Sequence, residues 1–223
     1  TGRNGRHPLP TPEALAATFS RLGVTAGRQV IAYDSSLNNY AGRVWWTLRW
    51  LGHMSVAVLD GGLGKWKSEG RGLTAEVPVP KTAVFTGRAN DNMRVSADTI
   101  LAAIGKPGLQ VVDARAPERY SGAAETIDPV GGHIPGALLR FGKENINPDG
   151  TYKSPEVLRA DFTRLLGDTP PDQVVHQCGS GVSACNNIIA MELAGLPGVK
   201  LYVGSWSEWC SDPSRPVATG SKP

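Results

Sequence analysis

An internal repeat constrains the fold of this chain more than any other feature of its sequence. Residues 11–22 (TPEALAATFSRL) align with residues 154–165 (SPEVLRADFTRL), with seven identical positions and two exchanges between Ser and Thr. A second match, of residues 30–34 with residues 174–178, follows at almost the same offset. Self-similarity in a fixed order is the signature of a duplicated structural unit. We therefore predict two related units of roughly 120 residues each, an ordinary size for a domain.

The two copies differ in how much sequence precedes the repeated helix. The second copy is preceded by a long segment that includes VVDAR at 111–115 and GHIPGA at 132–137, whereas almost nothing precedes Thr11. We expect the first unit to lack its opening half, which is truncated, cleaved or supplied by another chain. The expected divisions are 1–73 for the incomplete first unit, 74–92 for a linker, 93–212 for the complete second unit and 213–223 for a tail.

The hydrophobic pattern predicts an α/β fold with parallel sheets flanked by helices. Short apolar runs between turn residues are typical of buried parallel strands. We expect such strands at 29–33, 55–59, 109–113, 173–176 and 200–203, and helices at 12–22, 41–51 and 183–194. Thr11 and Ser154 are predicted helix caps because each is followed by a proline, a residue suited to the first helical turn. The proline-containing segment 74–92 shows no helical period and is expected to be extended.

Composition excludes several classes of function. The net charge is +3 and evenly spread, which argues against nucleic-acid binding. No run approaches the roughly 18 apolar residues of a transmembrane helix, and no leader peptide opens the sequence. Three cysteines without a CxxC motif favour neither a disulfide scaffold nor zinc, so we expect no metal or organic cofactor. The expected location is a reducing cytoplasm, with the periplasm open because a leader would lie upstream of residue 1.

The most informative segment follows the strand predicted at 173–176. It reads CGSGVSA from Cys178, and a helix is predicted from Ser183, so Cys178 lies where open α/β sheets bind ligands. Gly179 and Gly181 allow backbone N–H groups to turn toward the sulfur, and the positive end of the helix favours a thiolate there. The alternative is a small buried cysteine at a tight turn. Cys185, inside the predicted helix, is expected to pack in the core, and Cys210 is expected to be structural.

A cysteine phosphatase would use a similar arrangement of strand, loop and helix. Such an enzyme needs an arginine at the end of the loop to bind phosphate through two hydrogen bonds. The corresponding residues here are Ser183 and Ala184, and the loop is neutral. The loop therefore favours sulfur chemistry over phosphate hydrolysis.

Several motifs together resemble the tandem-domain sulfurtransferases of the rhodanese superfamily. The resemblance covers nearly the whole chain, and the CGSGVS loop is similar to that of the 3-mercaptopyruvate type. In the second copy the matching segments are VDAR (112–115), ERY (118–120), GHIPGA (132–137), CGSGVSA (178–184) and GSWSEW (204–209). In the first copy they are YD (33–34), RVWW (43–46), GH (52–53) and LDGG (59–62), which match the inactive domain of the family.

The resemblance implies a mechanism in two half-reactions. Cys178 would take sulfur from a small donor as a persulfide, and a thiol acceptor, including a thioredoxin-like protein, or cyanide would remove it. Ser180 would assist proton movement, and Arg119 would bind the donor's carboxylate or sulfonate. Residues 179 and 181–183 (Gly179, Gly181, Val182 and Ser183) would complete the binding loop. Asp34 replaces the cysteine in the first copy, so that unit should be catalytically silent.

The donor remains open between two compounds at this stage. The neutral loop and Arg119 favour 3-mercaptopyruvate, whereas Asp128 stands where mercaptopyruvate enzymes carry a second arginine and so favours thiosulfate. A third reading is a persulfide carrier or interaction module without turnover, because an incomplete first unit would expose apolar surface. His133 and Arg115 are expected to be structural, Arg115 through a pair with Asp113 or with a neighbouring loop. In mercaptopyruvate enzymes an aspartate from the missing half is thought to complete the relay through Ser180.

Overall fold

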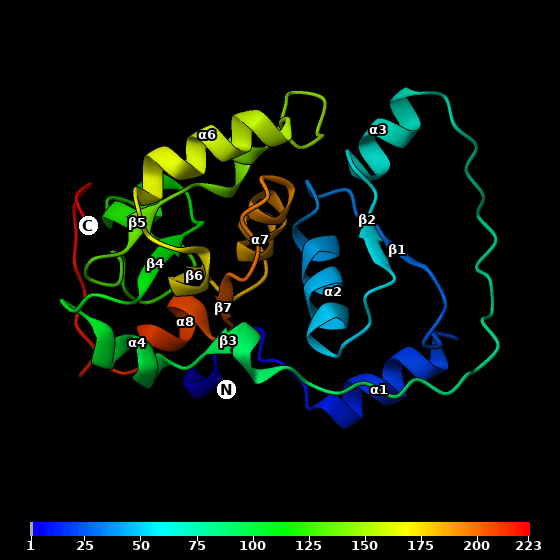
Figure 1. The fold of residues 1–223 in the computed structure, drawn as a ribbon, viewed down its shortest axis with the longest axis horizontal. Coiled ribbons are helices and arrows are strands. Elements are labelled where there is room, and N and C mark those ends of the chain that lie inside the picture. Colours follow the sequence, from blue (N-terminus) through cyan, green and yellow to red (C-terminus); the bar gives the residue numbers. More distant parts are fainter. Residues whose placement is uncertain (1) are drawn as a thin grey trace.

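The computed structural model describes residues 2–223, which form two parallel sheets with helices around them (Figure 1). The first sheet pairs β1 (Val30–Ala32) with β2 (Val56–Val58). The helices of this unit are α1 (Pro12–Arg21), α2 (Asn39–Trp50) and α3 (Gly62–Ser68). Strands β1 and β2 and helices α1 and α2 agree with the elements expected in the first copy, whereas α3 was not expected.

The second sheet has five parallel strands in the order β3-β7-β6-β4-β5. They are β3 (Arg94–Val95), β4 (Gln110–Asp113), β5 (Leu138–Leu139), β6 (Val174–Gln177) and β7 (Lys200–Tyr202). The helices are α4 (Ala97–Ala103), α5 (Pro117–Ser121), α6 (Pro155–Leu166), α7 (Ala184–Leu193) and α8 (Ser205–Trp209). Strands β3 and β5 were not expected, because two-residue strands carry no readable periodicity.

The repeat found in the sequence is a repeat of structure. Helices α1 and α6 begin in the same way: Thr11 Oγ1 accepts a hydrogen bond from the backbone N–H of Ala14 (3.3 Å), and Ser154 Oγ accepts one from Val157 (3.4 Å). Both predicted caps are confirmed. The order α1-β1-α2-β2 recurs as α6-β6-α7-β7. Within residues 2–223, the first unit has no counterparts of β3, β4 and β5.

The two units share one hydrophobic core, in which α2 lies beside α7 (Figure 1). Trp46 and Leu48 of α2 belong to the same buried cluster as Ile188 and Met191 of α7. Gly42 permits the close contact, because a Cβ there would lie 3.3 Å from atoms of Asn186 and Ile189. Helix α7, which follows the cysteine loop, is therefore packed against α2 of the first unit.

The segment between the units has no regular structure from residue 71 to residue 90 and passes along α1. The backbone N–H of Ala83 donates to the carbonyl of Ser20 (2.9 Å), and the ring of Phe85 packs on that of Phe19 (5.5 Å between centroids). The domain boundaries set from the sequence stay predictions. None of the helices in residues 2–223 is long and apolar enough to cross a membrane.

Candidate active site

Cys178 lies at the carboxyl end of β6, a buried strand between β4 and β7, and is only 1% exposed. The loop after it is fastened to the start of α8. The backbone N–H groups of Trp206 and Ser207 donate to the carbonyls of Cys178 and Gly179, each at 2.9 Å. Ser205 Oγ accepts the Cys178 N–H (3.1 Å) and donates to the carbonyl of Tyr202 (2.8 Å). The carbonyls of Cys178 and Gly179 are thus hydrogen-bonded to the start of α8.

The backbone N–H groups of the same loop have no such partners within residues 2–223. Among the residues the structure describes, no acceptor pairs with a backbone N–H of residues 179–183. Successive unpaired backbone N–H groups form a concave site that attracts an anion. The start of α7 adds the positive end of a helix dipole. The loop can therefore stabilise negative charge on the sulfur of Cys178.

The first unit contains the same kind of cradle with its anion in place. Asp34 stands at the position of Cys178 in the repeat, at an offset of 144. Its carboxylate accepts hydrogen bonds of 2.7–3.0 Å from the backbone N–H groups of Ser36, Asn38, Tyr40 and Ala41. A carboxylate carries no sulfane sulfur. This loop thus illustrates anion binding by the repeated backbone without offering a nucleophile.

Gly179 and Gly181 of the loop are restricted to glycine by different contacts. Gly181 has φ +74°, and a Cβ on it would lie 2.2 Å from the carbonyl oxygen of Val203, so no side chain fits. Gly179 has no such backbone restriction. A Cβ there would lie 3.1 Å from Nη2 of Arg6 and 3.4 Å from Nη1 of Arg119. Gly179 therefore lets two guanidinium groups approach the residue next to Cys178.

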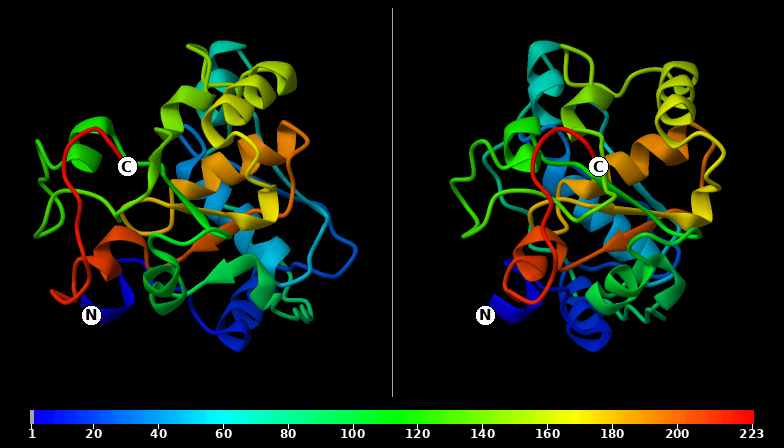
Figure 2. Two further views of the ribbon diagram at one scale, coloured as in Figure 1. Left: turned by 60° about the vertical axis from the view of Figure 1, so that its left-hand side comes forward. Right: turned by 90° about the vertical axis from the view of Figure 1, so that its left-hand side faces the viewer.

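Ser180 lies 2.8 Å from a group that the sequence did not indicate, the Nδ1 atom of His7. His7 belongs to an N-terminal segment that packs on α8 (Figure 2). The N–H of Arg6 donates to Ser207 Oγ (3.0 Å), and Gly5 faces the carbonyl of Gly204. No local pattern could reveal this approach, because 173 residues separate His7 from Ser180.

Arg119, on α5, is held by two carboxylates. Its Nε donates to both oxygens of Glu125 (2.9 and 3.1 Å), and its Nη2 donates to Asp128 (2.9 Å). Burial raises the pKa of Glu125, but hydrogen bonds from Arg119 and from two backbone N–H groups outweigh this effect and bring the pKa below its ordinary value. Asp128 also pairs with Arg6. Asp128, which stands where the resemblance led us to expect a second arginine, is thus bound by two arginines.

These groups surround one cavity of about 380 Å³ above Cys178. Of the predicted site residues, only Gly181 is absent from its lining, since Gly181 turns the backbone behind it. The lining comes from both units: Arg6, His7, Ser36, Asn39, Tyr40, Arg119, Cys178, Gly179, Ser180, Val182 and Ser183. The sequence did not indicate Arg6, His7 or the three residues Ser36, Asn39 and Tyr40, which come from the loop before α2 and the start of that helix.

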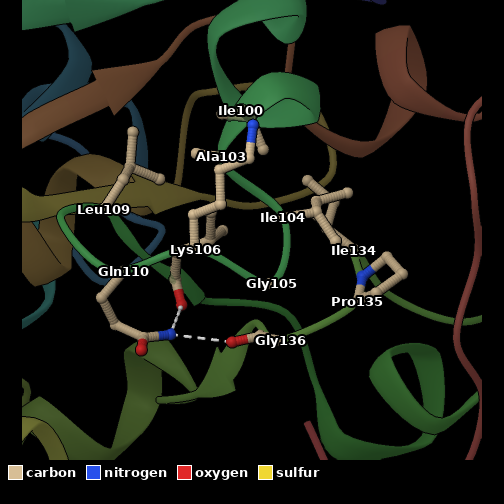
Figure 3. Close-up of a pocket in the computed structure, with 11 residues that line it drawn as sticks. Ile100, Ala103, Ile104, Gly105, Lys106, Leu109, Gln110, Ile134, Pro135 and Gly136 are labelled. Atoms are coloured by element: carbon tan, nitrogen blue, oxygen red, sulfur yellow. Dashed lines mark hydrogen bonds between the residues drawn. The ribbon is translucent and has the colours of Figure 1, made fainter.

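Another cavity, of about 190 Å³, lies at the opposite end of the second sheet (Figure 3). It is bounded by α4, the start of β4 and the turn at Pro135. Its polar side chains are engaged: Gln110 Nε2 donates to two carbonyls, one of them that of Gly136 (2.8 Å), and Lys106 Nζ donates to Ala102 (2.8 Å). Its lining contains no cysteine or histidine, so it offers no comparable chemistry.

The remaining cysteines and buried histidines are unsuited to catalysis. Burial raises the pKa of the Cys185 thiol to about 12 and also raises the pKa of Cys210. Burial lowers the pKa of His176 to about 3. His133 stacks on a tyrosine ring, with 3.8 Å between centroids. Within residues 2–223, no group of three His, Cys, Asp or Glu side chains could hold a metal ion.

The predicted pair of Arg115 with Asp113 is confirmed. Arg115 Nε lies 3.1 Å from each carboxylate oxygen of Asp113, and its Nη2 lies 2.7 Å from Oδ2. Both side chains are almost fully buried. Arg115 also donates to the carbonyl of Gly132 (2.6 Å) and so fixes the GHIPGA turn beside α5. Its role is to shape the wall that carries Arg119.

The rhodanese-like domain matches this chain in two segments, residues 1–69 and 96–212. The chain belongs to the rhodanese family. A protein of Pseudomonas aeruginosa named "Probable 3-mercaptopyruvate sulfurtransferase" is 46% identical over 220 residues, which are 98% of this chain and 78% of that protein. The thiosulfate sulfurtransferase of Bos taurus is 37% identical over 207 residues, 90% of this chain and 69% of the relative. This rhodanese-family chain is thus a sulfurtransferase.

Solved structures share the fold. Tum1 of Saccharomyces cerevisiae matches with a TM-score of 0.84 and 25% identity over 100% of this chain and 81% of its own. EanB in complex with ergothioneine matches with a TM-score of 0.85 and 23% identity. That match covers 95% of this chain, which spans only 55% of EanB. The rhodanese arrangement of parallel strands and flanking helices predicted from the sequence is confirmed.

Proposed function

We propose that this sulfurtransferase moves sulfane sulfur from 3-mercaptopyruvate to a thiol or cyanide acceptor through a persulfide on Cys178. The observation that carries the proposal is the surroundings of that sulfur. The loop that follows it has unpaired N–H groups at residues 179–183, and Ser180, its partner His7 and Arg119 line the same cavity as Cys178. The site thus offers a nucleophile, a proton relay and a group that binds carboxylates.

In the first half-reaction, the Cys178 thiolate attacks the sulfur of the donor. A sulfur–sulfur bond forms, and the bond between that sulfur and the donor's methylene carbon breaks. The electron pair leaves with the carbon as the enolate of pyruvate, which then takes up a proton. Ser180, paired with His7 Nδ1 at 2.8 Å, is placed to deliver this proton. The N–H groups of the loop stabilise the persulfide anion that remains.

In the second half-reaction, an acceptor thiolate attacks the outer sulfur of the persulfide. The Cys178 thiolate leaves, and the acceptor becomes a persulfide; with cyanide the product is thiocyanate. A thioredoxin-like dithiol would fit this step, because its second thiol can release the transferred sulfur as hydrogen sulfide. The cavity opens between the two units, which gives such an acceptor a route to Cys178. The reducing cytoplasm expected from the sequence stays a prediction.

Charge balance favours 3-mercaptopyruvate over thiosulfate as the donor. Thiosulfate is a dianion, and a site for it gains from an excess of positive charge. Here Glu125 and Asp128 balance Arg119 and Arg6. The arginines therefore offer directed N–H donors without a double positive charge, which suits a monocarboxylate. Phosphate hydrolysis is disfavoured by the same balance and by the absence of an arginine at residues 183 and 184.

Steady-state sulfur transfer to cyanide tests this function. We expect kcat/KM for 3-mercaptopyruvate to exceed that for thiosulfate by at least about tenfold. Thiosulfate has no carboxylate for the arginines to bind, and the loss of one charge-assisted hydrogen bond costs about that factor. Cys178→Ser should abolish transfer from both donors. Cys185→Ala is the matched control and should retain it, because its thiol is buried and neutral. A preference for thiosulfate would contradict the assignment, and a wild type inactive with both donors would favour the carrier alternative.

A further inference from the structure

Two guanidinium groups meet beside the residue that follows Cys178. Nη2 of Arg6 and Nη1 of Arg119 lie 3.1 and 3.4 Å from the position that a Cβ of Gly179 would take. Arg119 comes from α5 of the second unit, whereas Arg6 comes from the N-terminal segment. Both line the cavity above Cys178. The cavity thus has a second arginine that does not belong to the motifs of the second unit.

Asp128 holds the two arginines in this arrangement. One of its carboxylate oxygens pairs with Nη1 of Arg6, and the other accepts from Nη2 of Arg119 at 2.9 Å. The Asp128 side chain is 3% exposed, whereas that of Arg6 is 34% exposed. A buried carboxylate needs partners of this kind, so Asp128 fixes the direction of both guanidinium groups.

The atoms that remain free are those nearest Gly179. In the part of the chain that the structure describes, neither Nη2 of Arg6 nor Nη1 of Arg119 donates a hydrogen bond. Each presents its N–H groups beside the loop that carries the nucleophile. Two guanidinium edges side by side match the two oxygens of a carboxylate.

We propose that Arg6 is the second carboxylate-binding residue of the donor site, and that Asp128 is the positioning residue that orients Arg6 beside Arg119. This inference rests on the proposed function, because it assigns the donor's carboxylate to these two arginines. It also removes the conflict seen in the sequence. Asp128 stands where an arginine was expected, and the arginine is supplied instead by residue 6.

Arg6→Gln tests the inference, with Arg3→Gln as the matched control. Arg3 lies in the same segment and is exposed, and the two changes remove the same charge. We expect Arg6→Gln to raise KM for 3-mercaptopyruvate about ten- to a hundredfold with kcat nearly unchanged, the effect of losing a charge-assisted hydrogen bond to the bound donor. Arg3→Gln should leave both constants as in the wild type.

Inhibition by pyruvate separates carboxylate binding from sulfur chemistry. Pyruvate carries the carboxylate but no sulfur, so its inhibition constant should rise in Arg6→Gln by a factor similar to that of KM. Asp128→Asn should raise the same two constants, because the guanidinium groups lose their orienting charge. The reversed pair Arg6→Asp with Asp128→Arg should bring KM back toward the wild-type value, since a guanidinium group again faces Gly179.

Three results would overturn the inference: an unchanged pyruvate constant in Arg6→Gln, equal effects of Arg6→Gln and Arg3→Gln, or a fall in kcat at constant KM. The last would mean that Arg6 acts through its neighbour His7 and not on the donor. These results differ from a failure of the proposed function, which would show as a wild type that does not use 3-mercaptopyruvate at all. Thermal unfolding of each variant confirms that the fold is intact.

Discussion

At the scale of single residues, the chain contains two versions of one loop, one with an aspartate and one with a cysteine. Asp34 and Cys178 hold the same position in the repeat. The backbone around Asp34 donates four hydrogen bonds to its carboxylate, whereas the N–H groups of residues 179–183 have no acceptor in the described part of the chain. The cradle is thus a property of the repeated backbone, and catalysis depends on which side chain enters it. Ser180 and His7 are additions specific to the second unit's site.

The pair of Ser180 and His7 should matter for the step that releases carbon. We expect Ser180→Ala and His7→Gln each to lower kcat with 3-mercaptopyruvate about a hundredfold, the usual contribution of a positioned proton donor. The double variant should lose little more, because the two groups act as one relay. Steady-state rates with each donor measure this effect.

Thiosulfate provides the control for this relay. Its leaving group is sulfite, which departs as an anion and needs no proton. The same variants should therefore lose much less activity with thiosulfate than with 3-mercaptopyruvate. Equal losses with the two donors would mean that Ser180 and His7 serve the cysteine itself and not the leaving group.

At the scale of elements, the loop between β6 and α7 is held open by α8. Backbone N–H groups at the start of α8 donate to the carbonyls of Cys178 and Gly179. Ser205 adopts φ 54°, which is rare for a residue with a side chain. Such strain persists where surrounding contacts enforce it. The carbonyls of Cys178 and Gly179 are engaged by α8, whereas the N–H groups of residues 179–183 have no acceptor among the described residues. The GSWSEW motif of residues 204–209 is therefore part of the active-site structure, although it supplies no reacting group.

Gly181→Ala should damage this loop. Its Cβ would meet the backbone oxygen of Val203 at 2.2 Å, and φ +74° disfavours any side chain. We expect kcat to fall more than about tenfold and stability to fall by about 1–3 kcal/mol. Gly105→Ala is the matched control, because Gly105 has φ +72° and no atom within 4 Å of its Cβ position. That variant should lose about 1–2 kcal/mol of stability, the cost of the left-handed backbone alone, and keep its activity. Urea unfolding and rates check both; an active Gly181→Ala would contradict the account.

The elements also show what sequence patterns can and cannot predict. Cap residues and apolar runs located α1, α6 and the longer strands, because these depend on local chemistry. The pair of His7 with Ser180 and that of Arg6 with Asp128 depend on an N-terminal segment lying against α8, which no local pattern encodes. One signal was available. An acid where a donor-binding arginine was expected implied that a cation elsewhere in the chain would balance it.

At the scale of the whole molecule, the unit without a cysteine forms part of the cavity above Cys178. Its loop contributes Ser36, and the start of α2 contributes Asn39 and Tyr40. Its helix α2 packs on α7 in a single core, and Arg43 Nη1 donates to the carbonyl of Gly181 at 2.5 Å. The two units should therefore unfold together, in one transition.

Widening the contact between α2 and α7 tests this dependence. Gly42→Leu would force a side chain against Asn186, Ile189 and Cys185, whose atoms lie 3.3–3.4 Å from the Cβ position. Overpacking of this kind costs about 1–3 kcal/mol, and here the strain falls on the helix that begins at the cysteine loop. We expect one unfolding transition in urea, shifted to lower concentration, together with a clear loss of kcat.

Gly64→Leu is the control for that experiment, since Gly64 lies in α3, is exposed and has no atom within 4 Å of its Cβ position. It should unfold and turn over like the wild type. If Gly42→Leu instead gives two separate transitions with full activity, the units are independent and the first serves only as a scaffold. If both activity and stability fall together, the position of α7, and with it the N–H groups around Cys178, depends on the unit that lacks a cysteine.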